Sequence, residues 1–221
     1  AFMRIVSGRF DADKEVYHVQ GGKKLRLSRP QQLMAAEREI IAEAYAGDII
    51  GVFDPGIFSI GDTLCAPGKK FRFDPIPTFA PEHFKRVRSL DTMKRKQFLK
   101  GMEQIAQEGA IQIFKTPYTG MEEVIVGVVG TLQFDVLEYR LKNEYNVELY
   151  MEGLPYEYLR WIETDDGEPV KEEDLILGTD VKLVEDYKGN QLLLFGSQWA
   201  IGWTEERNKN LTFHEFGGTK F

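Results

Sequence analysis

Residues 91–110 read DTMKRKQFLKGMEQIAQEGA, and this stretch decides how the middle of the chain folds. Asp91 favours the N-cap of a helix, because its carboxylate accepts hydrogen bonds from the first free backbone amides. Gly109 suits the end of the same helix, since glycine tolerates the left-handed conformation common there. The apolar residues between them recur on one face at helical spacing: Phe98, Met102, Ile105 and Ala106. The pattern predicts a helix over residues 92–107.

The segments on either side of this helix predict an alternation of strands and helices. Strands are expected at residues 71–76 (an edge strand), 110–114, 124–129 and 147–150. A second helix is expected from Thr131, with an apolar face of Phe134, Leu137, Leu141 and Tyr145. Pro81 favours a short helical turn at residues 82–84. The order β-α-β-β-α-β over residues 71–153 is that of the ferredoxin-like, split βαβ motif.

Residues 154–221 suggest a weaker α+β repetition of this order. A helix is expected over residues 199–207, with Ser197 as its N-cap. Strands are expected at residues 159–163, 181–185, 191–195 and 211–216. The fold class expected for residues 71–221 is therefore α+β.

Residues 1–66 consist of short β-favouring runs separated by turns that contain glycine. Two such runs are Val16-Tyr17-His18-Val19 and Ile49-Ile50-Gly51-Val52-Phe53. Many short strands at close spacing predict a small closed β-barrel. Residues 67–70, which include a proline and a glycine, are expected to link this barrel to the α+β domain at residues 71–221.

The composition is that of a folded chain with an acidic balance. Its 221 residues include 28 Lys and Arg against 35 Asp and Glu, a formal net charge of −7, and 43% of them are apolar. No run of about 18 apolar residues predicts a transmembrane helix, and no signal peptide is visible. The one cysteine, Cys65, cannot form an internal disulfide. We therefore expect a soluble, cytoplasmic chain without a membrane partner.

Sequence motifs for catalysis are missing. The sequence has no phosphate-binding P-loop, no dinucleotide fingerprint and no serine- or zinc-hydrolase motif. Cys65 has no histidine near it in the sequence and is expected to be a small buried hydrophobic residue. His18, His83 and His214 are too scattered to form a metal site with it. The sequence predicts no catalytic, cofactor-binding or metal-binding residue.

A local basic run contrasts with the acidic whole. Residues 85–100 carry seven basic side chains and one acidic side chain, Asp91, a net charge of +6. The basic residues are Lys85, Arg86, Arg88, Lys94, Arg95, Lys96 and Lys100. Such a run can contact RNA phosphates or an acidic protein surface. The alternative reading is an ordinary solvated helix face.

Five segments resemble translational GTPases. AGDIIGV at 46–52 and IGDTL at 60–64 resemble the second-domain β-barrel that this superfamily shares. LKGMEQIAQEGA at 99–110, VGVVGTLQFDV at 126–136 and RLKNEYNV at 140–147 resemble the domain that follows the barrel. Together these segments extend the resemblance over nearly the whole chain.

Within that superfamily, the chain most resembles the peptide chain release factor 3 family of bacteria. An elongation factor G would be expected to have Glu-Glu-Asp-Pro where this chain has QEGA at 107–110. It would also have Gly-Glu-Leu-His-Leu where this chain has GTLQF at 130–134. FAPE at 79–82 likewise resembles the release factor pattern.

The resemblance implies a ribosome-dependent GTPase that speeds the departure of class I release factors after peptide release. The family's GTP-binding domain, which holds GTP and magnesium, is not in this sequence, so we expect a C-terminal fragment of a longer protein. Its domains would dock on ribosomal RNA and protein through the basic run, couple to GTP hydrolysis elsewhere, and affect class I release factors indirectly. Alternatives are a stand-alone RNA- or protein-binding module without GTPase activity and, below it, an enzyme with a pocket between the domains.

Overall fold

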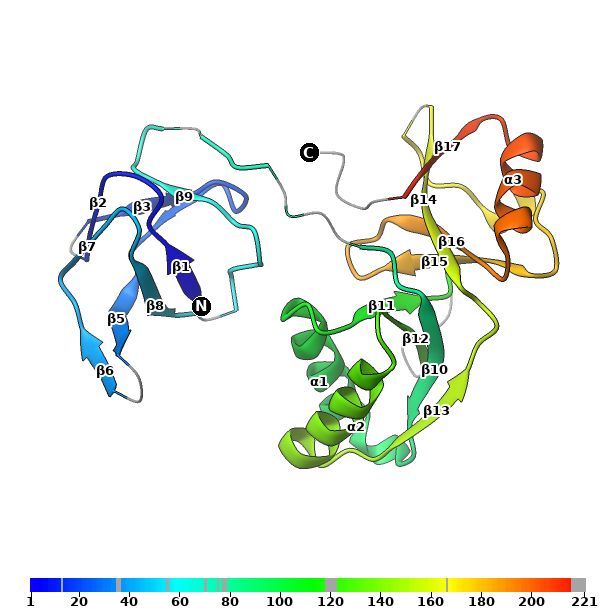
Figure 1. Ribbon diagram of the computed structural model, residues 1–221, viewed down its shortest axis with the longest axis horizontal. Coiled ribbons are helices and arrows are strands. Elements are labelled where there is room, and N and C mark those ends of the chain that lie inside the picture. Colours follow the sequence, from blue (N-terminus) through cyan, green and yellow to red (C-terminus); the bar gives the residue numbers. More distant parts are fainter. Residues whose placement is uncertain are drawn as a thin grey trace. The chain divides into compact units, whose positions relative to one another are not determined.

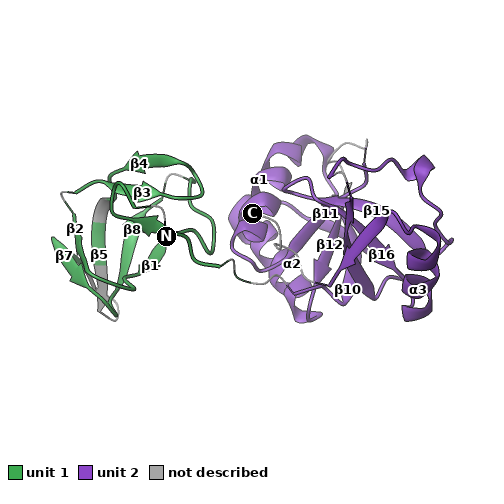
Figure 2. Ribbon diagram, turned by 90° about the horizontal axis from the view of Figure 1, so that it is seen from above, with its two compact units in different colours: residues 1–76 green, residues 77–221 purple. Residues whose placement is uncertain are grey.

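The computed structural model describes residues 1–12, 14–34, 37–54, 56–69, 71–74, 76, 79–117, 123–165 and 167–215. The chain divides into two compact units, Ala1–Ile76 and Pro77–Phe221 (Figure 1, Figure 2). Both consist mostly of antiparallel sheet, and the described helices belong to the second unit. The linker predicted at residues 67–70 lies within the first unit, and its role stays a prediction.

The first unit is made of short strands in three antiparallel sheets. The sheet orders are β1-β8-β5-β6, β2-β7 and β4-β3-β9. Its apolar core contains Phe10, Leu27, Ala44, Ile50 and Val52. The strands are β1 (Phe2–Arg4), β2 (Arg9–Asp11), β3 (Val16–His18), β4 (Lys23–Leu25), β5 (Ser28–Met34), β6 (Glu37–Ile40), β7 (Glu43–Tyr45), β8 (Ile49–Phe53) and β9 (Leu64–Cys65).

The second unit is built on one eight-stranded sheet. Its strand order is β13-β10-β12-β11-β15-β16-β14-β17. The elements of its first half are β10 (His83–Ser89), η1 (Thr92–Lys94), α1 (Arg95–Gln107), β11 (Gln112–Lys115), β12 (Glu123–Val128), α2 (Leu132–Tyr145) and β13 (Leu149–Gly153). Those of the second half are β14 (Tyr158–Thr164), η2 (Glu172–Asp174), β15 (Val181–Asp186), β16 (Gln191–Phe195), α3 (Gln198–Arg207) and β17 (Leu211–His214).

The two halves of this sheet have mirrored strand orders. Numbered along the chain within each half, the order is 4-1-3-2 in the first and 2-3-1-4 in the second. They join where β11 pairs antiparallel with β15, at Phe114–Asp186 and Lys115–Glu185. The second-half strands and helix expected from the sequence are confirmed, with the last strand ending at His214 and residue 216 outside the described residues. They repeat the first half in this mirrored order.

The predicted helix ends are also confirmed. Asp91 caps η1, which leads directly into α1, and its Oδ1 accepts a 2.9 Å hydrogen bond from the Met93 amide. Gly109, after α1, has a φ of +77°. Ser197 caps α3, and its hydroxyl accepts from the Ala200 amide at 3.3 Å. Local capping chemistry thus places these helix ends.

Three apolar clusters fill the second unit. The first lies between α1, α2 and the sheet and includes Phe98, Met102, Ile105, Phe134, Leu137 and Leu141. The third packs α3 against the second half of the sheet through Ala200 and Ile201. The cluster between them, called the central cluster here, draws on both halves and consists of Phe84, Phe114, Ile125, Leu159, Trp161, Val184, Leu192 and Leu194.

Two predicted elements differ from the structure. Residues 82–84 do not form a helical turn, because His83 begins β10, a central strand paired with both β12 and β13. The strand expected at 71–76 is not found in its described residues, 71–74 and 76. Strand β10 was not predicted because the cationic residues after Phe84 interrupt the alternation of apolar and polar residues that indicates a strand.

Gly101 lets α1 and α2 approach closely. A Cβ at this position would lie 2.4 Å from Leu141 Cδ2 and 3.0 Å from the Tyr145 ring. Leu141 is fully buried in the core, so it has little room to move aside. The absence of a side chain at this position therefore fixes how the two helices pack.

We expect Gly101→Ala to lower the free energy of unfolding by about 1 kcal/mol, because overpacking outweighs the gain in helix propensity. Chemical denaturation measures the change. Gln97→Ala, an exposed position on the same helix, is the control and should not destabilise the unit. A stabilised Gly101→Ala variant would contradict the close packing.

Candidate functional site

The seven basic residues of the predicted run lie on three consecutive elements. Lys85, Arg86 and Arg88 are on β10, Lys94 is at the end of η1, and the others are on α1: Arg95, Lys96 and Lys100. Neighbours in the sequence are therefore divided between a sheet and a helix. Which of them gather on one surface depends on the geometry of each element.

The β10 cations lie on opposite faces of the sheet, because successive side chains of a strand alternate. Lys85 is on the face covered by α2, and its Nζ lies 4.4 Å from the centre of the Phe134 ring. On the other face, the Arg88 guanidinium lies 4.6 Å from the Tyr150 ring centre, and Arg86 Nη1 lies 3.5 Å from Glu152 Oε2. These three cations do not form one patch.

Lys94 is engaged within the fold. Its Nζ donates a 2.7 Å hydrogen bond to the backbone carbonyl of Asn146, the residue that ends α2 with a φ of +55°. A cation at a helix C-terminus satisfies a free carbonyl and interacts favourably with the helix dipole. This lysine therefore ties η1 to the end of α2.

Lys96 and Lys100 form the cationic part of the outer face of α1. They are four residues apart, so their side chains lie on the same side of the helix. Both are exposed, and the buried residues Phe98, Met102 and Ile105 lie on the opposite side. Arg95 is also exposed, at the first position of the helix. The exposed basic surface is therefore smaller than the run in the sequence. Lys96 and Lys100, with Arg95 at the start of the helix, are called the basic ridge below.

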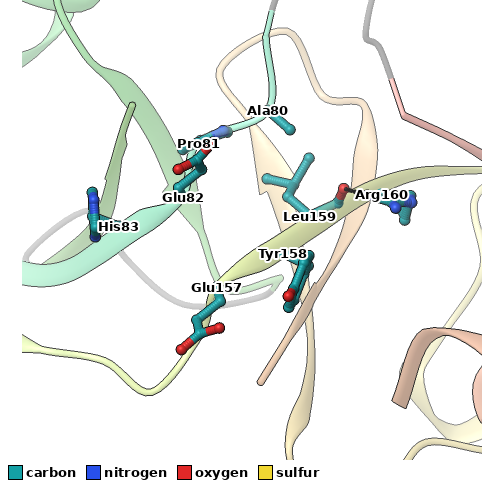
Figure 3. Close-up of a pocket in the computed structure, with 8 residues that line it drawn as sticks. All are labelled: Ala80, Pro81, Glu82, His83, Glu157, Tyr158, Leu159 and Arg160. Carbon is teal, nitrogen blue, oxygen red and sulfur yellow. Dashed lines mark hydrogen bonds between the residues drawn. The ribbon is translucent and has the colours of Figure 1, made fainter. Parts of the chain in front are cut away.

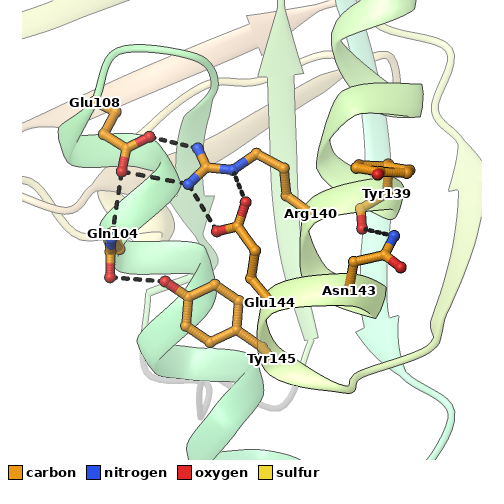
Figure 4. Close-up of polar contacts among 7 residues, drawn as sticks. All are labelled: Gln104, Glu108, Tyr139, Arg140, Asn143, Glu144 and Tyr145. Carbon is orange, nitrogen blue, oxygen red and sulfur yellow. Dashed lines mark hydrogen bonds and ion pairs between the residues drawn. The ribbon is translucent and has the colours of Figure 1, made fainter. Parts of the chain in front are cut away.

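Sequence reasoning missed a polar network that joins α1 to α2 (Figure 4). Arg140 Nε and Nη2 donate to the two Glu144 oxygens at 2.8 and 2.9 Å, and Nη1 donates to Glu108. Tyr145 donates from its hydroxyl to Gln104 Oε1 at 2.7 Å. The spacing of Arg140 and Glu144, four apart on a helix, was the available signal. The contact with Glu108 is not predictable locally, since it is 32 residues away.

This network shifts the acidity of its members. The hydrogen bond from Arg140 lowers the pKa of Glu108, and the same donor lowers the pKa of Glu144. The hydrogen bonds to Glu144 and then Glu108 raise the pKa of Arg140. Burial raises the pKa of Tyr145. The charged forms of Arg140, Glu108 and Glu144 thus stabilise one another and hold α1 against α2.

An open hollow of about 500 Å³ lies in the second unit, lined by residues that begin β10 and β14 (Figure 3). Arg160, on its rim, pairs with Glu215 at 3.0 Å. The lining residues are Ala80, Pro81, Glu82, His83, Glu157, Tyr158, Leu159 and Arg160. They contain no nucleophile activated by an adjacent base, so the hollow does not indicate catalysis.

The described residues contain no group of three or more His, Cys, Asp or Glu side chains arranged to hold a metal ion. His18 is buried, and its Nε2 lies 2.8 Å from Asp62 Oδ2. Asp62 also accepts a hydrogen bond from the Ser59 amide at 2.8 Å, so its carboxylate supports a turn. In the part of the chain that the structure describes, no helix has the length and apolar character needed to span a membrane.

We expect Arg140→Met to destabilise the second unit at neutral pH and to have a smaller effect in acid. A carboxylate with a lowered pKa stabilises the fold above its ordinary value of 4.5, and this contribution is lost as the pH falls through the lowered pKa. The Glu108 side chain is 44% exposed, so screening limits the loss from its ion pair to about 0.5–1 kcal/mol.

Urea unfolding between pH 7 and pH 3 measures this difference. Lys142→Met, which removes a 3.5 Å ion pair between two exposed side chains, Lys142 and Glu148, is the control and should change stability less at pH 7. If Arg140→Met lowers the free energy of unfolding by the same amount at pH 7 and at pH 3, the stabilisation by the network does not depend on the ionised carboxylates of Glu108 and Glu144.

Two family models match the chain, one for each unit. "Class II release factor RF3, C-terminal domain" matches residues 73–205, and "Elongation factor G domain 2" matches residues 1–67. The first match covers more than half of the chain. It includes the basic ridge on α1, the polar network and the hollow.

Similar curated proteins have the same family name. The chain is 52% identical over 213 residues to peptide chain release factor 3 of Symbiobacterium thermophilum, covering 96% of this chain and 39% of that protein. It is 44% identical over 215 residues to the protein of that name from Gloeobacter violaceus, covering 97% and 40%. The chain thus spans about 39% of the length of these relatives. It belongs to the class II release factor RF3 family, whose C-terminal domain it carries.

Proposed function

We propose that this chain provides the ribosome-docking domains of a translation termination factor. The observation that carries the proposal is the match of both units to domains of translation factors, with relatives named peptide chain release factor 3. In this proposal the chain couples GTP hydrolysis in another domain to the dissociation of class I release factors. In this proposal that domain, with its GTP and magnesium, would belong to the part of the relatives that this chain does not cover.

The finer architecture forms part of the same proposal. We infer that residues 1–66 form a closed β-barrel, which their short antiparallel strands and the match to elongation factor G domain 2 support. We infer a ferredoxin-like motif within residues 71–153, supported by the 4-1-3-2 strand order with a helix in each crossover. Residues 67–70 would link the two domains.

The basic ridge is the proposed contact with ribosomal RNA. Lys96 and Lys100 are exposed on one side of α1, at a spacing that lets both reach neighbouring phosphates. Arg95 extends this surface. Lys85, Arg86 and Arg88, which lie on the two faces of a sheet strand, and Lys94, which holds the end of α2, would contribute less.

We expect no catalysis by the described residues, so class I release factors would be affected indirectly, through the ribosome. The cytoplasm, where translation takes place, is the proposed location. A stand-alone binding module is not favoured, because both units match domains of translation factors and the second matches a release factor.

We expect the chain to bind bacterial ribosomes with an affinity that falls steeply with salt, because phosphate contacts release counterions. The double variant Lys96→Glu/Lys100→Glu should bind more weakly. The slope of log affinity against log salt should become less negative by about 1.5, for two lost contacts. Sedimentation of the chain with 70S ribosomes over a salt series measures both effects.

The matched control, Lys171→Glu/Lys188→Glu, reverses the charge of two exposed lysines elsewhere on the same unit. It changes the net charge by the same amount and should retain the wild-type slope. Equal losses in both double variants would show a general charge effect and remove the assignment to α1. A wild-type chain that does not sediment with ribosomes would overturn the docking proposal itself.

A further inference from the structure

The second half of the eight-stranded sheet has a different connection where the first half has a long helix. In the first half, α1 joins β10 to β11, and α2 joins β12 to β13. In the second half, α3 joins β16 to β17, but the connection from β14 to β15 contains only the short η2 in its described residues. Residues 168–177 of this connection are called the strap below. The strap takes the place of α1 in the order of elements.

Apolar side chains of the strap cover part of the second half. Val170, Leu175 and Leu177 are partly buried and pack against the third apolar cluster, which α3 also covers. The residues between the first two of these are exposed: Lys171, Glu172, Glu173 and Asp174. The strap therefore buries apolar surface as a helix would, but without a regular helix to hold its backbone.

Two side-chain amides hold the backbone of the strap. Gln191, the first residue of β16, donates from Nε2 to the Val170 carbonyl at 2.7 Å, and its Oε1 accepts from the Val170 amide at 2.7 Å. Asn208, which ends α3, donates from Nδ2 to the Ile176 carbonyl at 2.9 Å, and its Oδ1 accepts from the Ile176 amide at 2.9 Å. Each amide thus exchanges two hydrogen bonds with one backbone residue, as a paired antiparallel strand does.

The strap can leave without breaking the sheet. The backbone hydrogen bonds of η2 are local, from the Asp174 amide to the Lys171 carbonyl and from the Leu175 amide to the Glu172 carbonyl. The pairs of β14 and β15 with β16 involve no residue of the strap. Segments with few buried contacts open at a lower free energy than the core of a unit. The bonds to Gln191 and Asn208 are therefore the main polar obstacle to release.

We propose that the strap is a releasable cover, which opens as one piece while the sheet and α3 stay folded. Both amide anchors and the apolar side chains near them hold the same short segment, so the loss of one anchor weakens the other. Release uncovers apolar surface of the third cluster, and return of the strap covers it again. The inference is independent of the proposed function, because it concerns the second unit alone.

Native-state hydrogen exchange at the Ile176 amide tests this device. In the unchanged chain, the Val170 and Ile176 amides should exchange through one common opening and faster than the slowest amides of β16. Gln191→Leu removes the anchor at Val170 and leaves the bond between Ile176 and Asn208 in place. The Ile176 amide should then exchange about tenfold faster, because the closed strap has lost two hydrogen bonds.

A second variant and a matched control accompany Gln191→Leu. Gln191→Glu keeps the size of the side chain and the acceptor for the Val170 amide but loses the donor, so it should also speed exchange at Ile176. The control is Gln112→Leu, because Gln112 likewise begins a strand and donates to a backbone carbonyl, that of Phe79, at 2.7 Å. It should leave exchange at Ile176 unchanged.

The slowest amides of β16 serve as the internal reference in every variant. The inference requires that exchange at Ile176 accelerates more than exchange at these amides. Equal opening free energies for Ile176 and β16 in the unchanged chain would overturn it, because the strap would then open only when the unit unfolds. Unchanged exchange at Ile176 in both Gln191 variants would also overturn it, since the two ends of the strap would open separately.

Discussion

The second unit depends on the burial of two open sheet faces against each other. α1 and α2 cover one face of the first half, and α3 covers one face of the second, so each half leaves an apolar face without a helix. Those faces meet in the central cluster, where Phe84, Phe114 and Ile125 pack with Leu159, Trp161 and Leu192. Because apolar burial drives folding, the halves form one unit instead of two domains. The basic ridge on α1 is carried by this unit.

Much of the second unit could be predicted from local sequence signals. The three helices follow from apolar residues at helical spacing and from caps such as Asp91 and Ser197, which act within one turn. Strand β10 could not be predicted, because its basic residues Lys85, Arg86 and Arg88 interrupt the apolar alternation typical of a strand. These side chains pack on different partners on the two faces of the sheet. The pairing of β11 with β15 could not be predicted either, because strands about 70 residues apart leave no local sequence pattern of their pairing.

The candidate site shows the same limit. Seven basic residues close together in the sequence predicted one patch, but strand alternation and helix geometry distribute them over several surfaces. Lys94 holds the end of α2, and Lys85 packs on Phe134, so part of the charge stabilises the fold. Lys96 and Lys100 remain exposed together on one side of α1. The network around Arg140 stabilises the helix pair that carries this ridge.

Native-state hydrogen exchange of the second unit tests the shared core most directly. If the central cluster joins the halves, the slowest amides of β12 and β16 exchange with the same free energy. Leu192→Ala, which truncates a fully buried side chain of the second half, then lowers both by about 2–5 kcal/mol. Retained protection of β12 while β16 loses its own would contradict the account, because the halves would then unfold as independent domains.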